Sequence, residues 1–245
     1  MSLKDLTSDD LMQKLSTNTS YKFSAVKLDE LDETEYTLAT IVVDVTGSVS
    51  PFASSLLEMV RNIVKACRKA PRSDNLLVRI VTFNTNIYEI HGFQLLRHID
   101  EMTDYKSFNP YGATALYDAV HTSIDATLKY GEDLRDQDYG CNAIIAVITD
   151  GEDNSSNLSP GAIRDLLEDG IRKEKIESII SILIGVGRDT AGLKDFKDNA
   201  GLTQYIDAGD ATPENLAKIG GFISESISSQ SNALGSGSAS QPLTF

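Results

Sequence analysis

Hydrophobic residues along this chain follow two patterns, which alternate. Short unbroken apolar runs are typical of strands that are buried on both faces of a sheet. Longer stretches with apolar positions three or four residues apart predict amphipathic helices. We expect strands over residues 37–45, 76–83, 143–148, 179–186 and 204–206. We expect helices over residues 51–67, 114–130, 160–171, 212–227 and around 193–196. Strands that alternate with helices predict a doubly wound α/β fold, with a mostly parallel central sheet and helices on both faces.

A short polar turn interrupts this alternation once. Asn84-Thr85-Asn86 separates the run over 76–83 from a second apolar run over 87–90. Two runs joined by so tight a turn predict a β-hairpin, so we expect one antiparallel strand at the edge of the sheet. Residues 91–113 then show weak periodicity and predict a long connection, a feature that more often serves function than not.

The two ends of the chain differ in composition from the region between them. The N-terminal part carries many charges and hydroxyls and predicts a loosely attached segment, in which Leu11, Met12 and Leu15 line a short helix. The C-terminal part is rich in Ser and Gly, a composition typical of flexible segments. The sequence thus predicts an N-terminal extension (1–36), one domain (37–228) and a flexible tail (229–245).

Charge and composition limit which classes of partner and which cellular location are expected. Asp and Glu outnumber Lys and Arg by 36 to 22, which gives a formal net charge of −14. Because phosphate binding needs a basic surface, we expect neither nucleic acid nor an anionic membrane as a partner. No apolar run approaches the roughly 18 residues that cross a bilayer, and the N-terminus lacks the apolar core of a secretory signal. These features predict a cytoplasmic protein, with Cys67 and Cys141 as reduced, buried residues.

Oxygen-bearing side chains follow two of the predicted central strands. Asp44, Thr46 and Ser48 come directly after the first strand, and Asp150 follows the strand over 143–148. Thr114 precedes a predicted helix. The carboxyl ends of parallel strands meet at one edge of a sheet, so these side chains are expected to converge. Two carboxylates with no basic residue nearby in the sequence repel each other unless a cation neutralises them. An oxygen-only set of this kind suits Mg²⁺, with Mn²⁺ and Ca²⁺ as alternatives.

These motifs resemble the von Willebrand factor A (vWA) domain and its metal-ion-dependent adhesion site, over roughly residues 37–228. The family pattern is Asp-x-Ser-x-Ser after the first strand, a Thr before a helix and an Asp after the fourth strand. Asp44-x-Thr46-x-Ser48, Thr114 and Asp150 match these positions in turn. Thr46 departs from the usual Ser, but it keeps the hydroxyl and adds only a methyl group.

The resemblance implies a Rossmann-like vWA fold and a binding function rather than an enzymatic one. Asp44, Thr46, Ser48, Thr114 and Asp150 are then the expected ligands of a Mg²⁺ ion. An Asp or Glu of a protein partner is expected to complete the shell of the metal. Relatives that work inside cells suggest an ATPase or the subunits of a larger assembly as partners. Self-association through the ends of the chain is a further alternative.

The same residues allow other interpretations. A metal-free vWA scaffold that assembles through its surface and tails is the main alternative. A haloacid-dehalogenase-like phosphohydrolase needs an acid two residues after its nucleophile, where this chain has Thr46. A dinucleotide site needs Gly-x-Gly-x-x-Gly, and Gly47 stands alone there. None of the three histidines is placed for a serine hydrolase. Residues 152–154 predict a solvated loop, or else a segment that tunes the metal site or binds a second, weaker cation.

Overall fold

A mixed β-sheet runs through the middle of the molecule. The computed structural model describes residues 23–187 and 190–245, and within them six strands form one sheet in the order β3-β2-β1-β4-β5-β6. Only β3 is antiparallel among these strands, as the hairpin predicted. The strands are β1 (Glu35–Asp44), β2 (Leu76–Phe83), β3 (Ile87–Leu95), β4 (Gly140–Thr149), β5 (Ser178–Gly185) and β6 (Gln204–Asp207).

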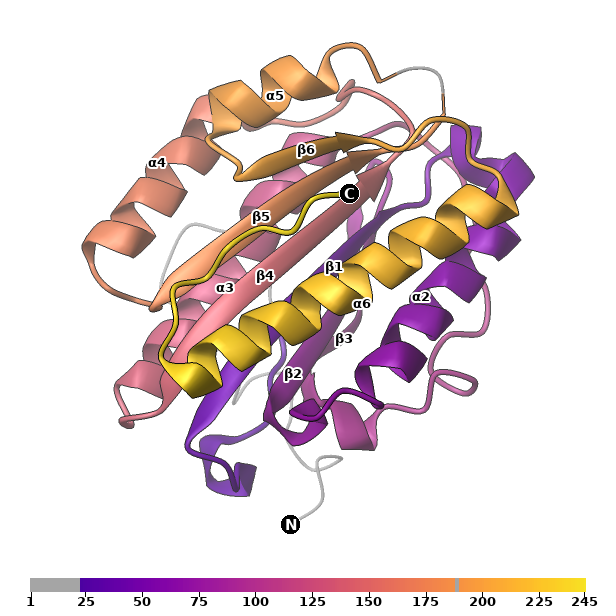
Figure 1. The fold of residues 1–245 in the computed structure, drawn as a ribbon. Coiled ribbons are helices and arrows are strands. Elements are labelled where there is room, and N and C mark those ends of the chain that lie inside the picture. Colours follow the sequence, from indigo (N-terminus) through magenta and orange to yellow (C-terminus); the bar gives the residue numbers. More distant parts are fainter. Residues whose placement is uncertain (1–22, 188–189) are drawn as a thin grey trace.

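Helices cover both faces of the sheet (Figure 1). On one face lie α2 (Ala53–Cys67) and α6 (Pro213–Ser236), which pack against each other and against β1. On the opposite face lie α3 (Leu116–Arg135), α4 (Pro160–Arg172) and α5 (Leu193–Ala200). The doubly wound α/β architecture is therefore as predicted. None of the described helices combines the length and the apolar character that a bilayer-crossing segment needs.

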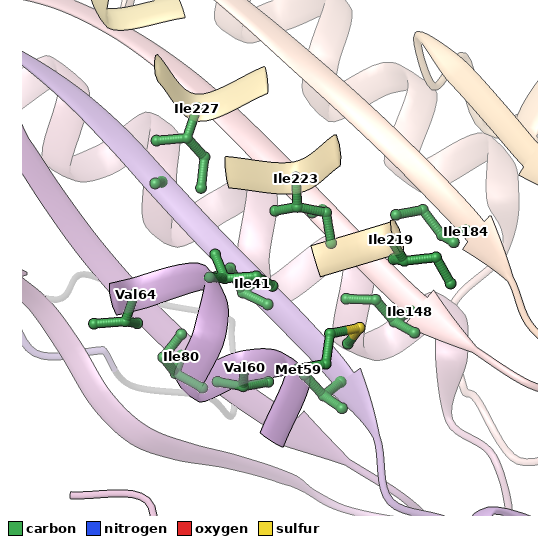
Figure 2. Close-up of a cluster of buried hydrophobic side chains, with 14 of the residues drawn as sticks. Ile41, Met59, Val60, Val64, Ile80, Ile148, Ile184, Ile219, Ile223 and Ile227 are labelled. Atoms are coloured by element: carbon green, nitrogen blue, oxygen red, sulfur yellow. The ribbon is translucent and has the colours of Figure 1, made fainter. Parts of the chain in front are cut away.

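The central strands bury both of their faces, which explains their unbroken apolar sequence. Ile41 of β1 faces the helices α2 and α6, whereas Val42 faces α3. Figure 2 shows the cluster on the side of α2 and α6, to which Ile41 and Ile148 of the sheet contribute together with Met59 of α2 and Ile223 of α6. Cys67 and Cys141 are both buried and form no disulfide, in agreement with the sequence.

The topology brings the two motif segments together. β1 and β4 are parallel neighbours, and Val43 pairs with Ile148 in their register. From β1 the chain continues to β2 on one side, while β4 continues to β5 on the other. The winding of the sheet therefore reverses between β1 and β4, the position where open α/β sheets bind ligands. Asp44 and Asp150 both lie at this position, at the carboxyl ends of the strands.

Some element boundaries differ from the prediction. β3 continues from Ile87 to Leu95 instead of ending at residue 90, because the register shifts opposite Arg79 and breaks the alternation on which the prediction rests. β1 begins at Glu35, two residues before its predicted start. A 3-10 turn over Gly47–Phe52 precedes α2, which therefore begins at Ala53 rather than at residue 51.

The last helix is longer than predicted and does not end at residue 227. Helix α6 continues to Ser236 and ends at Gly237, which adopts a left-handed conformation. The remaining residues fold back beside α6, over β4 and β5 (Figure 1). Gln230 donates a hydrogen bond to the carbonyl of Gln241, and Gln204 donates one to the carbonyl of Leu243. Two amide side chains of the domain thus bond to backbone carbonyls of the C-terminal segment. Its composition predicted that these carbonyls would bond to water instead.

Within the described part of the N-terminal region, the stretch around Val26 is attached more firmly than its composition indicates. Val26 donates a 2.8 Å hydrogen bond from its N–H to the carbonyl of Phe93, and its own carbonyl accepts one from Tyr130. The expectation of a loosely attached segment is therefore wrong for this stretch. The short helix predicted around Leu11, Met12 and Leu15 lies outside the described residues. The division into extension, domain and tail stays a prediction.

Candidate metal centre

Asp44 is the buried end of the candidate site. It is the last residue of β1, and only 1% of its surface is exposed. Its Oδ1 accepts a 2.8 Å hydrogen bond from the N–H of Thr46, and its Oδ2 accepts a 2.7 Å hydrogen bond from the hydroxyl of Thr149. Burial raises the pKa of this carboxyl group, and the hydrogen bonds from Thr149 and Thr46 oppose that rise. The structure therefore holds a potential anion in a fixed orientation where water does not stabilise its charge.

Three further oxygen-bearing side chains form a continuous chain beside Asp44. The hydroxyls of Thr46 and Ser48 lie 2.9 Å apart, and the Ser48 hydroxyl donates a 2.9 Å hydrogen bond to Oδ1 of Asp150. Ser48 is exposed and Asp150 is partly exposed, whereas Thr46 is buried. The oxygen atoms of these residues thus extend from the buried carboxylate to the protein surface.

Thr114 lies on a neighbouring loop that contacts this site through its backbone. Tyr111 donates a 3.1 Å hydrogen bond to the carbonyl of Val45, and Gly47 donates one of 3.4 Å to the carbonyl of Gly112. These bonds hold the loop before α3 against the loop that carries Thr46 and Ser48. Thr114 itself is buried. The structure therefore brings the predicted residues to one region, and their role as metal ligands stays a prediction.

Two residues of the loop after Asp150 hold Thr114 and the start of α3 in place. Asn154 accepts a 2.8 Å hydrogen bond from the N–H of Thr114, and its own N–H donates one of 3.0 Å to the carbonyl of Thr114. Asp153 accepts a hydrogen bond from the N–H of Tyr117 in the first turn of α3. Asn154 is exposed and Asp153 is partly exposed, so the loop is solvated as predicted, and it also bonds to Thr114 and to α3.

Asp118 anchors the far end of the same loop. Its carboxylate accepts a 3.0 Å hydrogen bond from the N–H of Asn157 and one of 2.9 Å from the N–H of Leu158. It is buried at the start of α3. The available signal in the sequence was the Asx- and Ser-rich segment after Asp150, because such side chains bond to nearby backbone. The sequence of this loop did not indicate that its bonding partners would lie on α3.

The donor set fits a small, hard cation. Two carboxylates and three hydroxyls supply oxygen atoms only, which is the chemistry that Mg²⁺ prefers over imidazole or thiolate ligands. Across residues 23–187 and 190–245, no group of three or more His, Cys, Asp or Glu side chains is placed to hold a metal. The candidate site contains only two residues of these four types, Asp44 and Asp150. Its other oxygen ligands would come from Thr and Ser hydroxyls.

Comparison with known proteins bears on the fold. No protein-family model and no curated protein matches this sequence. Solved structures do match. A D319A mutant of the PilB minor pilin from Streptococcus sanguinis has a TM-score of 0.60 and 15% identity, over 85% of this chain and 64% of that one. The ArnB paralog VWA2 from Sulfolobus acidocaldarius has a TM-score of 0.50 and 15% identity, over 78% of this chain and 45% of that one.

The chain has a vWA-like α/β fold. A third similar structure, proximal thread matrix protein 1 from the mussel byssus, has a zinc-occupied MIDAS motif. Its TM-score is 0.51 with 19% identity, over 81% of this chain and 47% of that one. At such identities the likeness describes the fold alone. The chain spans 64% of the pilin and less than half of the other two proteins.

Proposed function

We propose that this chain is an intracellular protein-binding module, which uses a divalent cation to bind an acidic side chain of a protein partner. The observation that carries the proposal is the chain of oxygen atoms from Thr46 through Ser48 to Asp150, beside the buried carboxylate of Asp44. It lies at the sheet position where the winding reverses, which is where ligands bind in this architecture.

Each residue has a distinct part in this proposal. Asp44, Thr46, Ser48, Thr114 and Asp150 would hold Mg²⁺, directly or through water, with Mn²⁺ and Ca²⁺ as alternatives. The cation supplies a local positive charge on a chain whose formal net charge is −14. Thr149 and the backbone N–H of Thr46 orient the Asp44 carboxylate. Asn154 fixes the backbone of Thr114. A partner carboxylate would be attracted to that charge, whereas the net negative charge of the chain repels it.

A metal-free scaffold is the second candidate, and one observation favours it. The side chains of Thr46, Ser48 and Asp150 hydrogen-bond with one another, so these polar groups are satisfied without a cation. In that case the same residues would serve only to join the ends of β1 and β4. We propose no enzymatic activity, because position 46 offers a hydroxyl where a phosphohydrolase of this architecture needs a general acid.

The test is selection of peptides by the immobilised full chain. The probe is a displayed library of 12-residue peptides with one fixed Glu among random positions, and a matched library carries Gln instead. We expect enrichment from the Glu library in Mg²⁺, and none in EDTA or from the Gln library. Asp150→Ala should abolish the enrichment, whereas Asp165→Ala, which removes an exposed charge on α4, should leave it unchanged. Equal enrichment in Mg²⁺ and EDTA would favour the scaffold.

A further inference from the structure

The outer edge of the sheet carries exposed apolar side chains close to the candidate metal centre. Tyr88 and Ile90 on β3 are 39% and 40% exposed, and Tyr111 on the loop before α3 is 53% exposed. The Tyr88 and Tyr111 hydroxyls form a hydrogen bond with each other. Large apolar side chains that are exposed together mark interaction sites more often than isolated ones do. We refer to Tyr88, Ile90 and Tyr111 as the apolar rim.

The apolar rim is continuous with the metal centre. The N–H of Tyr111 donates a hydrogen bond to the carbonyl of Val45, and Gly112 accepts one from Gly47. Val45 and Gly47 alternate with the candidate ligands Thr46 and Ser48 along the same loop. A partner residue bound at the cation therefore has the rim as a direct neighbour on the β3 side.

The β3 edge also offers main-chain hydrogen-bonding groups. β3 is the last strand of the sheet on this side and pairs with β2. In the part of the chain that the structure describes, its other side forms main-chain hydrogen bonds with a strand-like segment only around Phe93, and Ser24 of that segment also donates two hydrogen bonds to the carboxylate of Glu89. There Val26 donates to the carbonyl of Phe93, and the N–H of Phe93 donates to the carbonyl of Ser24. This edge thus already accepts one extended segment in parallel orientation, and the stretch beside Tyr88 and Ile90 is free of described strands.

We infer that the partner is an extended peptide segment with a single acidic residue at the cation and apolar or aromatic residues along the rim, paired with the edge of β3. This inference rests on the proposed function and names the class of partner for that same site. Charge supports it, because a formal net charge of −14 repels further carboxylates away from the cation. Apolar and aromatic side chains bury the most apolar area by covering Tyr88, Ile90 and Tyr111. When a peptide adds as a strand to the edge of a sheet, main-chain hydrogen bonds supply affinity, and every second side chain of the peptide supplies selectivity.

The peptide selection described above also tests this inference. In Mg²⁺ we expect the enriched peptides to carry apolar or aromatic residues on one side of the fixed Glu. The variant Tyr88→Thr/Ile90→Thr/Tyr111→Ser should bind a selected peptide at least about tenfold more weakly, since truncating large aromatic anchors has effects of this size. The same variant should bind Mg²⁺ as the wild type does. Ile171→Thr removes another exposed apolar side chain, on α4, and should change neither result.

The possible failures are distinguishable. If the peptides are enriched in Mg²⁺ without an apolar preference, or if the rim variant keeps full affinity, the inference is wrong and the proposed function stands. Absence of any Mg²⁺-dependent enrichment overturns the proposed function and the inference together. A benzophenone amino acid at position 90 should cross-link to a selected peptide. Cross-linking to residues 1–22 of the same chain instead, in the presence of that peptide, would assign the edge to the chain itself and overturn the inference.

Discussion

The hydroxyl of Ser48 donates a 2.9 Å hydrogen bond to the carboxylate of Asp150, although 102 residues separate them in the chain. Each residue comes just after a buried strand, and those two strands are parallel neighbours in the sheet. The contact therefore joins the two halves of the candidate metal centre at the position where the winding of the sheet reverses.

Asp44→Asn should separate stability from metal binding. Burial raises the pKa of Asp44, so between its unfolded and folded pKa values the folded protein binds more protons than the unfolded chain. The stabilising contribution of the protonated group is fully present below the unfolded pKa and is lost as pH rises through the folded pKa. The buried anion is therefore unfavourable at pH 7 without a cation. An amide is neutral and can replace both hydrogen bonds, because Thr149 can instead donate to the carbonyl of Gly151.

We expect metal-free Asp44→Asn to have a melting temperature at pH 7 at least equal to that of the wild type, while Mg²⁺ no longer stabilises it. Thermal melts in EDTA and in Mg²⁺, at pH 7 and pH 4, measure both effects. The gap between the two proteins in EDTA should narrow at pH 4. A large loss of stability on Asp44→Asn in EDTA would show that the negative charge itself holds the fold together.

Leu243→Ser tests whether the C-terminal segment is part of the domain. Leu243 is partly buried against the core cluster beneath α6, and its carbonyl accepts a hydrogen bond from Gln204. We expect the free energy of unfolding to fall by about 1–2 kcal/mol, the value of partial burial of one Leu side chain. Chemical denaturation measures it, with Thr244→Ser, at an exposed neighbour, as the control. Unchanged stability is the result expected of a solvated tail.

Gly92→Ala should detach the N-terminal segment from β3. A Cβ at position 92 would lie 1.8 Å from the carbonyl oxygen of Ser24, so the two backbones cannot both keep their places. The two hydrogen bonds between this segment and β3, from Val26 to Phe93 and from Phe93 to Ser24, should then be lost. Each loss should lower the free energy of unfolding by about 1 kcal/mol. Amide hydrogen exchange should become faster at both residues. Gly221→Ala is the control, because nothing lies within 4 Å of its Cβ and Ala is favoured over Gly within a helix.

His91 should make stability fall at mildly acidic pH. Its Nδ1 lies 2.8 Å from the carbonyl of Gly92, so Nδ1 carries the proton, and Nε2 accepts a hydrogen bond from the hydroxyl of Tyr105. Burial lowers the pKa of His91, so the unfolded chain binds a proton more readily than the folded protein. Stability is therefore complete above the unfolded pKa of about 6.5 and is lost as pH falls from there toward the folded pKa.

Denaturation at pH 7.5 and pH 5.5 should show a larger loss for the wild type than for His91→Gln. Equal losses in the two proteins would mean that other groups account for the pH dependence. Glu89 and Asp104 oppose the lowering and Arg79 adds to it, so the direction of the effect reflects burial more than charge.

The sequence predicts most of the fold because the strands of this sheet are buried on both faces and read as unbroken apolar runs. The boundaries of β2 were predicted at Leu76 and Phe83, as observed. The five candidate ligands were proposed from the sequence because each stands near the end of a strand or just before a helix, and their role as ligands stays a prediction. The unpredicted features depend on contacts between segments that are distant in sequence.

Two examples make the reason clear. Asn154 lies in an exposed loop, as expected, but its side chain also accepts a hydrogen bond from the N–H of Thr114, which lies 40 residues earlier on another element. The segment around Ser240 looked flexible because Ser and Gly have little to bury, yet its hydroxyl lies 2.6 Å from that of Ser178 on β5. Composition indicates how much apolar surface a segment can bury. It does not indicate which hydrogen-bonding partners on distant elements the fold brings next to that segment.

Calorimetric titration of Mg²⁺ into the wild type and into Asp150→Ala tests the central proposal most directly. Asp150 supplies the second carboxylate and is partly exposed, so its replacement should remove metal binding while the fold is kept. We expect saturable binding to the wild type and none to Asp150→Ala, with Asp165→Ala equal to the wild type. Absence of binding to the wild type, or equal binding to Asp150→Ala, would contradict a metal centre at this site.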